Sequence, residues 1–283
     1  VGAGLSSSAA LLVAVLTLLD AADASGRSAS TDRTEDPIDA LALALAVARE
    51  CQRIEHAYAG TPCGLMDPLA IAAGRAGHAI RLDCAAERFT HEPLPDGDEL
   101  EFLIVDTGVR RSLAEGRYAE RRRECEAAAR AIGLPEDRLA HADPSALNAI
   151  GDPAARRRAE HVVREHPRVK IFCRAMQAGD LDEMGRLLFA SHDSLRDRFE
   201  ASFPMADAIV DALRERRKSA GDVFGARMIG GGFGGCVLAL LRRGTAAAVL
   251  ADLRRKIHGA PDLRSAAFTV MPTRGPTAMP TML

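Results

Sequence analysis

Two hydrophobic periods run along this chain, one typical of helices and the other of strands. An apolar run over residues 8–22 predicts a helix that is hydrophobic nearly all round and therefore buried. A polar connection follows over 25–36, and Asp36 before Pro37 predicts the cap and first turn of a second helix that ends at Gly60. One face of that second helix carries an apolar stripe formed by Leu43, Val47, Cys51, Ile54 and Tyr58.

After the second helix, the pattern changes to short strand-like runs at 78–83 and 101–107. Proline and glycine at 93–97 interrupt the pattern, so we place a boundary there between domains at 1–97 and 98–283. The remainder alternates helical patterns with strand-like ones. The helical patterns cover 117–132, 153–164, 169–178, 181–192, 204–219 and 246–258, and the strand-like ones 226–230, 236–241 and 265–270. This alternation favours an α+β architecture in layers.

The composition describes a chain that can bury a large core. It has 283 residues, of which 47% are hydrophobic, and this length favours about two domains. The formal net charge is only −2, which gives no overall field to attract nucleic acid or a membrane, so we expect neither as a partner. The six cysteines show no CxxC pair and no histidine at metal-ligand spacing, which favours reduced thiols and a cytoplasmic protein.

A segment rich in glycine and serine opens directly onto the first apolar helix. Its members are Gly2, Gly4, Leu5, Ser6, Ser7, Ser8 and Ala9. Glycines let backbone amides turn inward, small hydroxyls add donors, and a helix N-terminus favours an anion, so the segment is typical of a phosphate cradle. Plain capping of a core helix by serine is the alternative, and the segment alone leaves both open.

A second glycine-rich run, Gly230–Gly235, contains the pattern G-x-G-x-x-G. It is followed by the strand-like Cys236–Leu240 and not by the helix that a dinucleotide-binding fingerprint needs. Two strands joined by glycines predict a flexible hairpin whose backbone can approach a ligand closely. An ordinary wide hairpin is the alternative interpretation.

Two carboxylates, Glu55 and Asp67, are candidates for chemistry. By itself, Asp67 before Pro68 is typical of a helix N-cap. Beside a phosphate cradle, however, phosphoryl transfer requires one carboxylate for a metal ion and another to orient or deprotonate the attacking hydroxyl. The chain has neither a Walker-type phosphate loop nor the motifs of a protein kinase, so a different kind of phosphate site is needed.

Five blocks in order resemble the GHMP kinase superfamily over essentially the whole chain. They are Gly4-Leu5-Ser6-Ser7-Ser8-Ala9-Ala10, the pairing of Glu55 with Asp67 in Cys63-Gly64-Leu65-Met66-Asp67, the stretch from Val105-Asp106-Thr107-Gly108-Val109 to Tyr118 and Glu124-Cys125, Ser191-His192-Asp193-Ser194-Leu195, and the run from Gly225 to Cys236. The resemblance implies a two-domain α+β fold with a truncated N-terminal domain and a ferredoxin-like α/β-sandwich as C-terminal domain.

The pairing of Glu55 with Asp67 is similar to that of a sugar 1-kinase, which implies ATP-dependent phosphorylation of the anomeric 1-hydroxyl of galactose. The resemblance implies that Ser8 and Glu55 hold Mg²⁺, while amides and hydroxyls between Gly2 and Ala9 bind the phosphates of ATP. The expected partners are therefore a small sugar and ATP.

Asp67 is implied as the catalytic group that accepts the proton of the sugar 1-hydroxyl or orients it, with Gly64 and Tyr118 also at the sugar. The Gly230–Gly235 run, called the glycine loop below, is implied to close over the site. The residues expected to do so are Gly231, Gly232, Phe233, Gly234 and Gly235.

Two features depart from the superfamily pattern. Pro68 stands where glutamine is usual, which bears on the fine positioning of Asp67. The first motif, a Gly-Glu-His-x-Asp run with an arginine that pairs with the catalytic aspartate, is expected upstream of Val1, so we expect negligible turnover from these 283 residues and a monomeric state. A non-catalytic sensor of sugar and ATP, or a kinase for another acceptor such as N-acetylgalactosamine or arabinose, is the alternative function.

Overall fold

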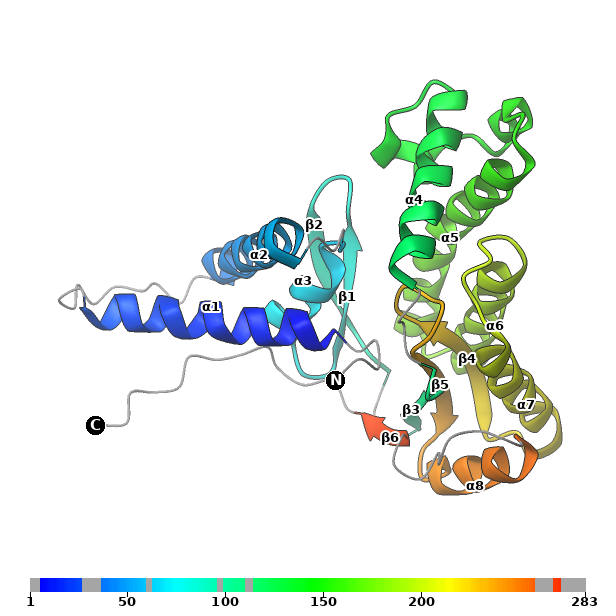
Figure 1. Cartoon of the computed structure of the whole chain (residues 1–283). Helices are drawn as coiled ribbons and strands as arrows, with labels where there is room; N and C mark the ends of the chain where they lie inside the picture. The colour runs from blue at the N-terminus through cyan, green and yellow to red at the C-terminus, as the bar shows by residue number, and fades with distance from the viewer. Residues whose placement is uncertain are drawn as a thin grey trace. The chain divides into compact units, whose positions relative to one another are not determined.

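A computed structural model describes residues 6–26, 37–59, 63–95, 99–109, 114–257 and 267–270 of the chain. It divides into two compact units (Figure 1), an N-terminal unit, Ser6–Pro93, and a C-terminal unit, Leu94–Met271. Each unit is described by itself. No helix in the described ranges is long and apolar enough to cross a membrane.

Three helices and a hairpin make up the N-terminal unit. Its elements are α1 (Ser7–Gly26), α2 (Pro37–Ile54), the π-helical turn η1 (Glu55–Ala59), α3 (Met66–Ala72), and the antiparallel strands β1 (His78–Asp83) and β2 (Arg88–Pro93). A small core joins them, formed by Ala48, Leu65, Leu69 and Ala73 with partly buried residues of α2 and the hairpin around it. The sequence predicts α1, α2 and β1, and a helix at α3 entered only through the alternative interpretation of Asp67 as an N-cap. Strand β2 was missed because Pro93 marks it as a break.

Helix α1 is not buried all round, so that prediction was wrong. Ala9 and Val13 are buried, whereas Leu11, Leu18 and Leu19 are 66%, 67% and 61% exposed. The reason is that α1 packs mainly on α2 and α3, which cover one side of it. An apolar composition shows that a helix has hydrophobic surface to bury. How much of that surface is buried depends on how many other elements pack against the helix.

The apolar stripe predicted on the second helix is also shifted. Its buried positions are Ala48, Cys51 and Glu55, while Leu43 is 51% and Tyr58 82% exposed. A π turn places an extra residue in the helical turn, so positions after it rotate away from the face that an α-helical period would give them. Ala48, Cys51 and Glu55 keep the spacing of one α-helical face, and the π turn that begins at Glu55 directs Tyr58 outward.

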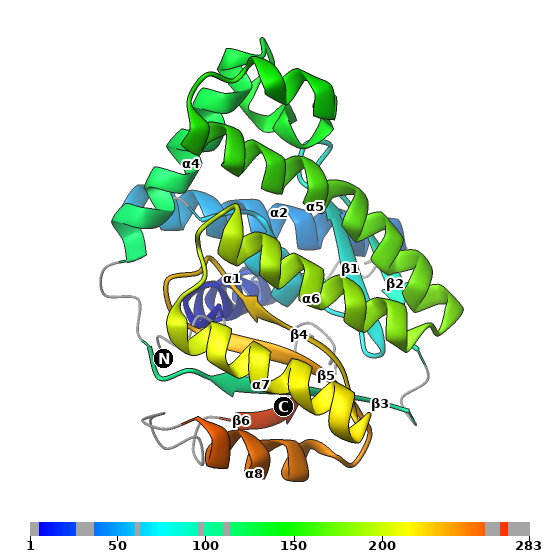
Figure 2. The same ribbon diagram turned by 90° about the vertical axis from the view of Figure 1, so that its right-hand side faces the viewer.

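An antiparallel sheet of strand order β4-β5-β3-β6 organises the C-terminal unit. Its strands are β3 (Leu100–Asp106), β4 (Val223–Ile229), β5 (Cys236–Arg242) and β6 (Ala267–Val270), and its helices are α4 (Ala114–Ala131), α5 (Pro153–Ala178), α6 (Leu181–Asp197), α7 (Pro204–Ala220) and α8 (Ala246–Lys256). Helices α6 and α7 lie over β4, and α8 packs beside α7 (Figure 2). These strands and most of these helices agree with the sequence pattern to within a few residues.

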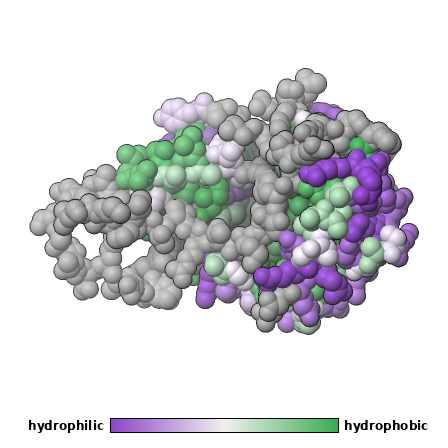
Figure 3. Space-filling model, turned by 90° about the horizontal axis from the view of Figure 1, so that it is seen from below, coloured by the Kyte–Doolittle hydropathy of each residue, from purple (hydrophilic) through white to green (hydrophobic). Residues whose placement is uncertain are grey.

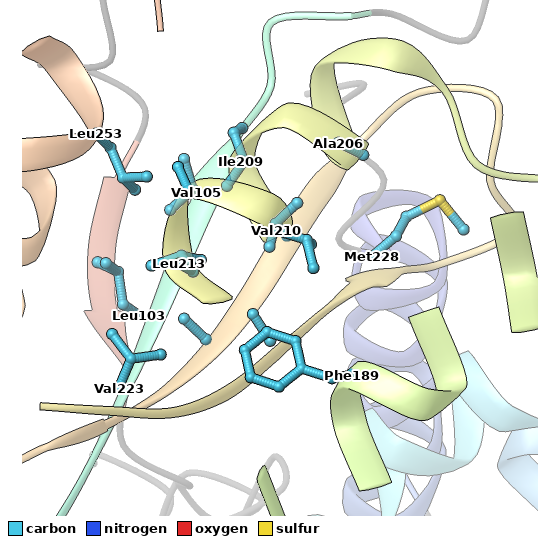
Figure 4. Packing of buried hydrophobic residues seen from close by; sticks show 14 of the residues in the cluster. Leu103, Val105, Phe189, Ala206, Ile209, Val210, Leu213, Val223, Met228 and Leu253 are labelled. Carbon is cyan, nitrogen blue, oxygen red and sulfur yellow. The ribbon is translucent and has the colours of Figure 1, made fainter. Parts of the chain in front are cut away.

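The main core lies between this sheet and its helices (Figure 4). Val105 of β3, Met228 of β4 and Ile209 of α7 are all fully buried there. Helix α6 approaches β4 backbone to backbone at one point, because a Cβ at Gly185 would lie only 1.9 Å from the Phe224 carbonyl oxygen. The two glycines Gly185 and Gly225 therefore set how closely α6 lies on the sheet.

Helix α5 is continuous, although the sequence predicts two helices on either side of Pro167. A proline inside a helix removes one hydrogen bond and costs about 3 kcal/mol, but α5 packs along both α4 and α6, and this burial outweighs the loss. Asp152 caps its start, and Gly179 ends it with a φ of 68°. Two 3₁₀ segments that the sequence did not reveal, η2 (Glu136–His141) and η3 (Pro144–Ala149), complete a second small core with α4 and α5.

Candidate functional site

The serine-rich segment lies at the N-terminus of α1. Ser6 has a positive φ of 55°, and its carbonyl oxygen accepts the Ala10 amide at 2.9 Å, which begins the helix. In an α-helix the amides of the first turn, here those of Ser7, Ser8 and Ala9, have no acceptor within the helix. This end of α1 thus presents donors with the dipole sign that suits an anion. Gly2, Gly4 and Leu5 lie outside the described residues.

Glu55 is a buried carboxylate, only 7% exposed, at the first position of the π turn. The Ser8 hydroxyl of α1 donates a hydrogen bond to its Oε1 atom, so the structure brings together the serine and the glutamate that the sequence pairs as metal ligands. Within the described part of the chain, Glu55 forms no ion pair with lysine or arginine. A buried carboxylate without a cationic partner is costly unless a cation binds it.

Cys63 connects Glu55 to the segment that carries Asp67. Its carbonyl oxygen accepts hydrogen bonds from Gln52 Nε2 at 3.1 Å and from His56 Nε2 at 2.8 Å, which tie this segment to α2 and the π turn. Burial, the hydrogen bond to Glu55, and the charges of Glu55 and Asp67 raise the pKa of the Cys63 thiol to about 12. Sequence reasoning missed Gln52, His56 and the thiol, because their role depends on the π turn.

Asp67 lies in the first turn of α3 and is half-buried, but it does not cap the helix. The N-cap position is Leu65, which makes no side-chain capping bond, so the alternative interpretation of Asp67 as a helix cap is wrong. In the described ranges its carboxylate has neither a hydrogen bond nor an ion pair. Pro68 and Leu69 are buried beneath it and hold the turn, while Gly64 is exposed, with open space where a side chain would be.

Among the described residues, the N-terminal unit thus holds the Ser8 hydroxyl against Glu55 and a further carboxylate, Asp67, and neither carboxylate has a basic partner there. Oxygen ligands of this kind suit a hard cation such as Mg²⁺, which usually takes only one or two carboxylates and keeps several waters. No cluster of three or more histidine, cysteine, aspartate or glutamate residues suited to a metal exists among the described residues. A cation at Ser8 and Glu55 would need its other ligands from water or phosphate.

The glycine loop joins β4 to β5 and is anchored on both sides. The Phe233 amide donates to the Ala201 carbonyl at 2.9 Å, and the Gly235 amide donates to the Val109 carbonyl at 3.1 Å. The Thr107 hydroxyl donates to the Gly235 carbonyl at 2.6 Å. Backbone bonds to neighbouring segments thus hold the loop at Phe233 and Gly235.

Close packing explains why the loop is so rich in glycine. A Cβ at Gly232 would lie 2.4 Å from the Ala201 carbonyl oxygen, and Gly232 also has a φ of 84°. Gly230, Gly234 and Gly235 likewise have positive φ values. Four of the five glycines are therefore required by the backbone of the loop itself.

Tyr118 of α4 lies against the glycine loop, as a Cβ at Gly231 would meet its ring at 3.3 Å. The Arg117 guanidinium lies 4.6 Å from the centre of the Phe233 ring. The structure thus brings Tyr118 and the loop together in the C-terminal unit, and Ser8, Glu55 and Asp67 belong to the N-terminal unit. Sequence reasoning missed Arg117, Thr107 and Ala201, whose contacts with the loop are long-range and leave no local signal.

The amino-acid sequence is similar to those of known proteins. Residues 172–259 match the family model described as GHMP kinases C terminal. The galactokinase of Bos taurus is 40% identical over 262 residues, which are 91% of this chain and 61% of that protein. The galactokinase of Homo sapiens is 38% identical, again over 91% of this chain and 61% of its own length.

Solved structures agree with the sequence matches. Lactococcus lactis galactokinase, determined in complex with galactose, has a TM-score of 0.79 and 30% identity, covering 97% of this chain and 66% of that one. The mevalonate kinase of L. major, at 22% identity and a TM-score of 0.50 over 82% of this chain, shares the fold.

The chain has the two-domain α+β fold of GHMP kinases, and its residues 172–259 match the C-terminal part of that family. In sequence it is similar to galactokinases, and it spans about 61% of the length of the curated galactokinases that it matches.

Proposed function

We propose that this chain carries the phosphate-binding, metal-binding and proton-accepting parts of a galactokinase, which phosphorylates the anomeric 1-hydroxyl of galactose with ATP. The observation that carries the proposal is the pairing of buried Glu55 with Ser8 at the N-terminus of α1. The likeness to galactokinases, one of them solved with galactose, supports the choice of sugar. The domain division belongs to the same proposal, with 1–97 as the remnant of the N-terminal domain and 98–283 as the C-terminal domain.

Each group has a task that its surroundings suit. The first-turn amides of α1 and the Ser6 and Ser7 hydroxyls bind phosphate oxygens, because they are donors at the positive end of a helix. The segment from Gly2 to Leu5 belongs to the same phosphate site in this proposal. Ser8 and Glu55 provide oxygen ligands for Mg²⁺. Bound Mg²⁺ and ATP would supply charge neutralisation and the phosphoryl group.

Asp67 accepts or orients the proton of the sugar hydroxyl. Its carboxylate is unengaged in the described part of the chain, and α3 holds it on a rigid turn over Pro68 and Leu69. Positioning and proton acceptance are what a kinase residue at this place contributes. Gly64 and Tyr118 contact the sugar in this proposal, and residues Gly231–Gly235 form the edge that closes on the ligands.

The first test is binding of ATP to the 283-residue chain by calorimetry, with and without Mg²⁺. We expect Mg²⁺ to strengthen binding and Glu55→Gln to remove most of that gain, while Glu50→Gln in the same helix leaves it intact. Glu50 is a suitable control because it is exposed and pairs with Arg53. Equal Mg²⁺ dependence in Glu55→Gln and the unchanged chain would contradict the metal site.

The second test is galactose-dependent release of ADP by the longest reading frame that contains this chain. Removal of a catalytic base or orienting group should lower the rate by a factor of about 10² to 10⁴ in Asp67→Asn. Asp83→Asn, on β1 of the same unit, should keep full activity. Binding of galactose and ATP without turnover would favour the sensor, and turnover with N-acetylgalactosamine or arabinose alone would change the acceptor.

A further inference from the structure

The block Ser191-His192-Asp193-Ser194-Leu195 of α6 has no task in the proposed reaction, yet three of its polar side chains are buried. Ser191, His192 and Ser194 are 2%, 0% and 1% exposed. Ser191 donates to Glu165 Oε2 at 2.7 Å, and Ser194 lies 2.9 Å from His161 Nδ1, so both are satisfied by α5. His192 is different because it points toward β4 and α7 instead.

His192 takes a backbone bond from the edge of the sheet. The Met228 amide donates to His192 Nδ1 at 3.3 Å. Because β4 is the outer strand in the described sheet, its outward amides have no strand partner, and His192 supplies an acceptor for one of them. Nδ1 is therefore the unprotonated nitrogen, which leaves the ring proton on Nε2.

The other side of the imidazole faces α7. His192 Nε2 lies 3.2 Å from Asp207 Oδ1, although the alignment falls short of a full hydrogen bond and the contact is mainly electrostatic. Asp207 also accepts the Ser202 hydroxyl at 2.5 Å. Burial opposes the charge on Asp207, but the contact with His192 and the hydrogen bond from Ser202 outweigh it, and the pKa of Asp207 falls below its usual range.

The two partners of His192, the Met228 amide and Asp207, both belong to segments next to the glycine loop. Met228 is the last residue but one of β4, directly before the loop begins at Gly230. Ser202 adjoins Ala201, whose carbonyl accepts the Phe233 amide and against which Gly232 packs. His192 thus touches the strand that enters the loop and, through Asp207, the segment on which the loop rests.

We infer that His192 is a positioning residue for the glycine loop: it holds the end of β4 and the Ala201–Ser202 segment in the relative arrangement that fixes Gly232 and Phe233. The consequence for ligand binding rests on the proposed function, in which the loop contacts the ligands. The positioning itself requires no ligand. An experiment can therefore refute the positioning role of His192 without refuting the proposed function, and the reverse.

Amide hydrogen exchange of the ligand-free chain tests this inference. In His192→Leu, which keeps the volume but loses both contacts, we expect the amides of Phe233 and Gly235 to exchange at least tenfold faster. Amides in the middle of α5 should keep their rates. Unchanged rates at Phe233 and Gly235 would overturn the inference, and so would a uniform increase across the C-terminal unit, which would indicate general destabilisation only.

Two conservative variants separate the two contacts and serve if His192→Leu does not fold. His192→Asn retains an acceptor where Nδ1 lies, and His192→Gln retains a donor where Nε2 lies. We expect each to restore part of the protection of the Phe233 amide that the leucine variant loses. The matched control is His161→Gln. His161 is a buried histidine on α5 that contacts the Ser194 hydroxyl and not the Met228 amide or Asp207, so this variant should leave the loop amides unchanged.

If both conservative variants give the loop amides the rates of the unchanged chain and Asp207→Asn does too, the inference is wrong. A failure of galactose phosphorylation in any of these proteins leaves the exchange result unaffected, because no substrate is present.

Discussion

At the scale of single residues, the Cys63 thiol reports on the two carboxylates of the candidate site. Burial raises its pKa to about 12, helped by the hydrogen bond to Glu55 and the charges of Glu55 and Asp67. Glu55→Gln removes one of those charges, so we expect the pKa of Cys63 to fall and alkylation at pH 8 to accelerate several-fold. Mass spectrometry of the Cys63 peptide after timed iodoacetamide treatment measures this rate.

The control for that experiment is Glu50→Gln, since Glu50 contributes to the raised pKa of Cys51 but not to that of Cys63. An equal acceleration at Cys63 in both variants would show that the effect comes from general loosening of the unit.

His161 makes the folding free energy depend on pH. Burial, followed by the charges of Arg227, Arg168 and Arg198, lowers its pKa to about 3, so it stays neutral in the folded chain at pH 5. The unfolded chain takes up a proton near the ordinary pKa of 6.5, and this stabilises the unfolded state as the pH falls. Between pH 7 and pH 5 the chain should lose roughly 2 kcal/mol more stability than His161→Gln. Urea unfolding at both pH values measures the difference, and parallel losses in the two proteins would refute it.

At the scale of elements, the contact between α6 and β4 is limited by two glycines. A methyl group at Gly185 would overlap the Phe224 carbonyl, which is backbone and cannot rotate away. Gly185→Ala should therefore lower the free energy of unfolding by about 1 to 3 kcal/mol or more. Gly116→Ala in α4 has open space around it and should instead stabilise the chain by about 0.5 to 1 kcal/mol. Chemical denaturation of both variants compares them, and equal stabilities would contradict the close approach.

The sequence predicted those helix ends that are determined by residues close to them in the chain. Pro37 predicts a helix start and the helical pattern over 169–178 predicts a helix end, and the structure has helix ends at both places. The continuity of α5 through Pro167 could not be predicted, since it depends on packing against α4 and α6. The π turn that follows α2 also left no signal, and it turned Tyr58 away from the face on which Ala48 and Cys51 are buried.

In the candidate site, too, the local motifs could be predicted and the long-range contacts could not. The serine segment, Glu55 and Asp67 are recognisable as motifs, because phosphate and metal chemistry needs those residue types. The anchoring of the glycine loop on Ala201 and Val109, and the contacts of His192, join residues far apart in the chain. Only the folded arrangement reveals them.

At the scale of the whole molecule, the family motifs divide between two units. The described serines Ser6, Ser7 and Ser8 lie in the N-terminal unit with Glu55 and Asp67, and Tyr118 and the glycine loop lie in the C-terminal unit. The two units also differ in the size of their cores, because the C-terminal unit has twenty buried residues in its main cluster and the N-terminal unit four in its own. The larger core is expected to supply most of the stability of the chain.

The smaller unit leaves apolar surface uncovered. Hydrophobic side chains gather over this unit (left in Figure 3), and α1 contributes a stripe of Leu11, Val15, Leu18 and Leu19. A contiguous apolar surface of this kind promotes association in water. The 283-residue chain should therefore bind hydrophobic dyes and self-associate at high concentration.

Leu18→Gln tests this expectation on one helix. Leu18 is 67% exposed, so its replacement should reduce dye binding and raise the concentration at which the chain associates, with a change in unfolding free energy within about 0.5 kcal/mol. Val13→Ala on the same helix is the contrasting variant, because Val13 is fully buried and its truncation leaves a cavity. It should lower the free energy of unfolding by about 1 kcal/mol or more and leave the exposed stripe unchanged. Light scattering and dye fluorescence, measured with urea unfolding, separate the two effects. A large loss of stability in Leu18→Gln would mean that this side of α1 is covered in solution.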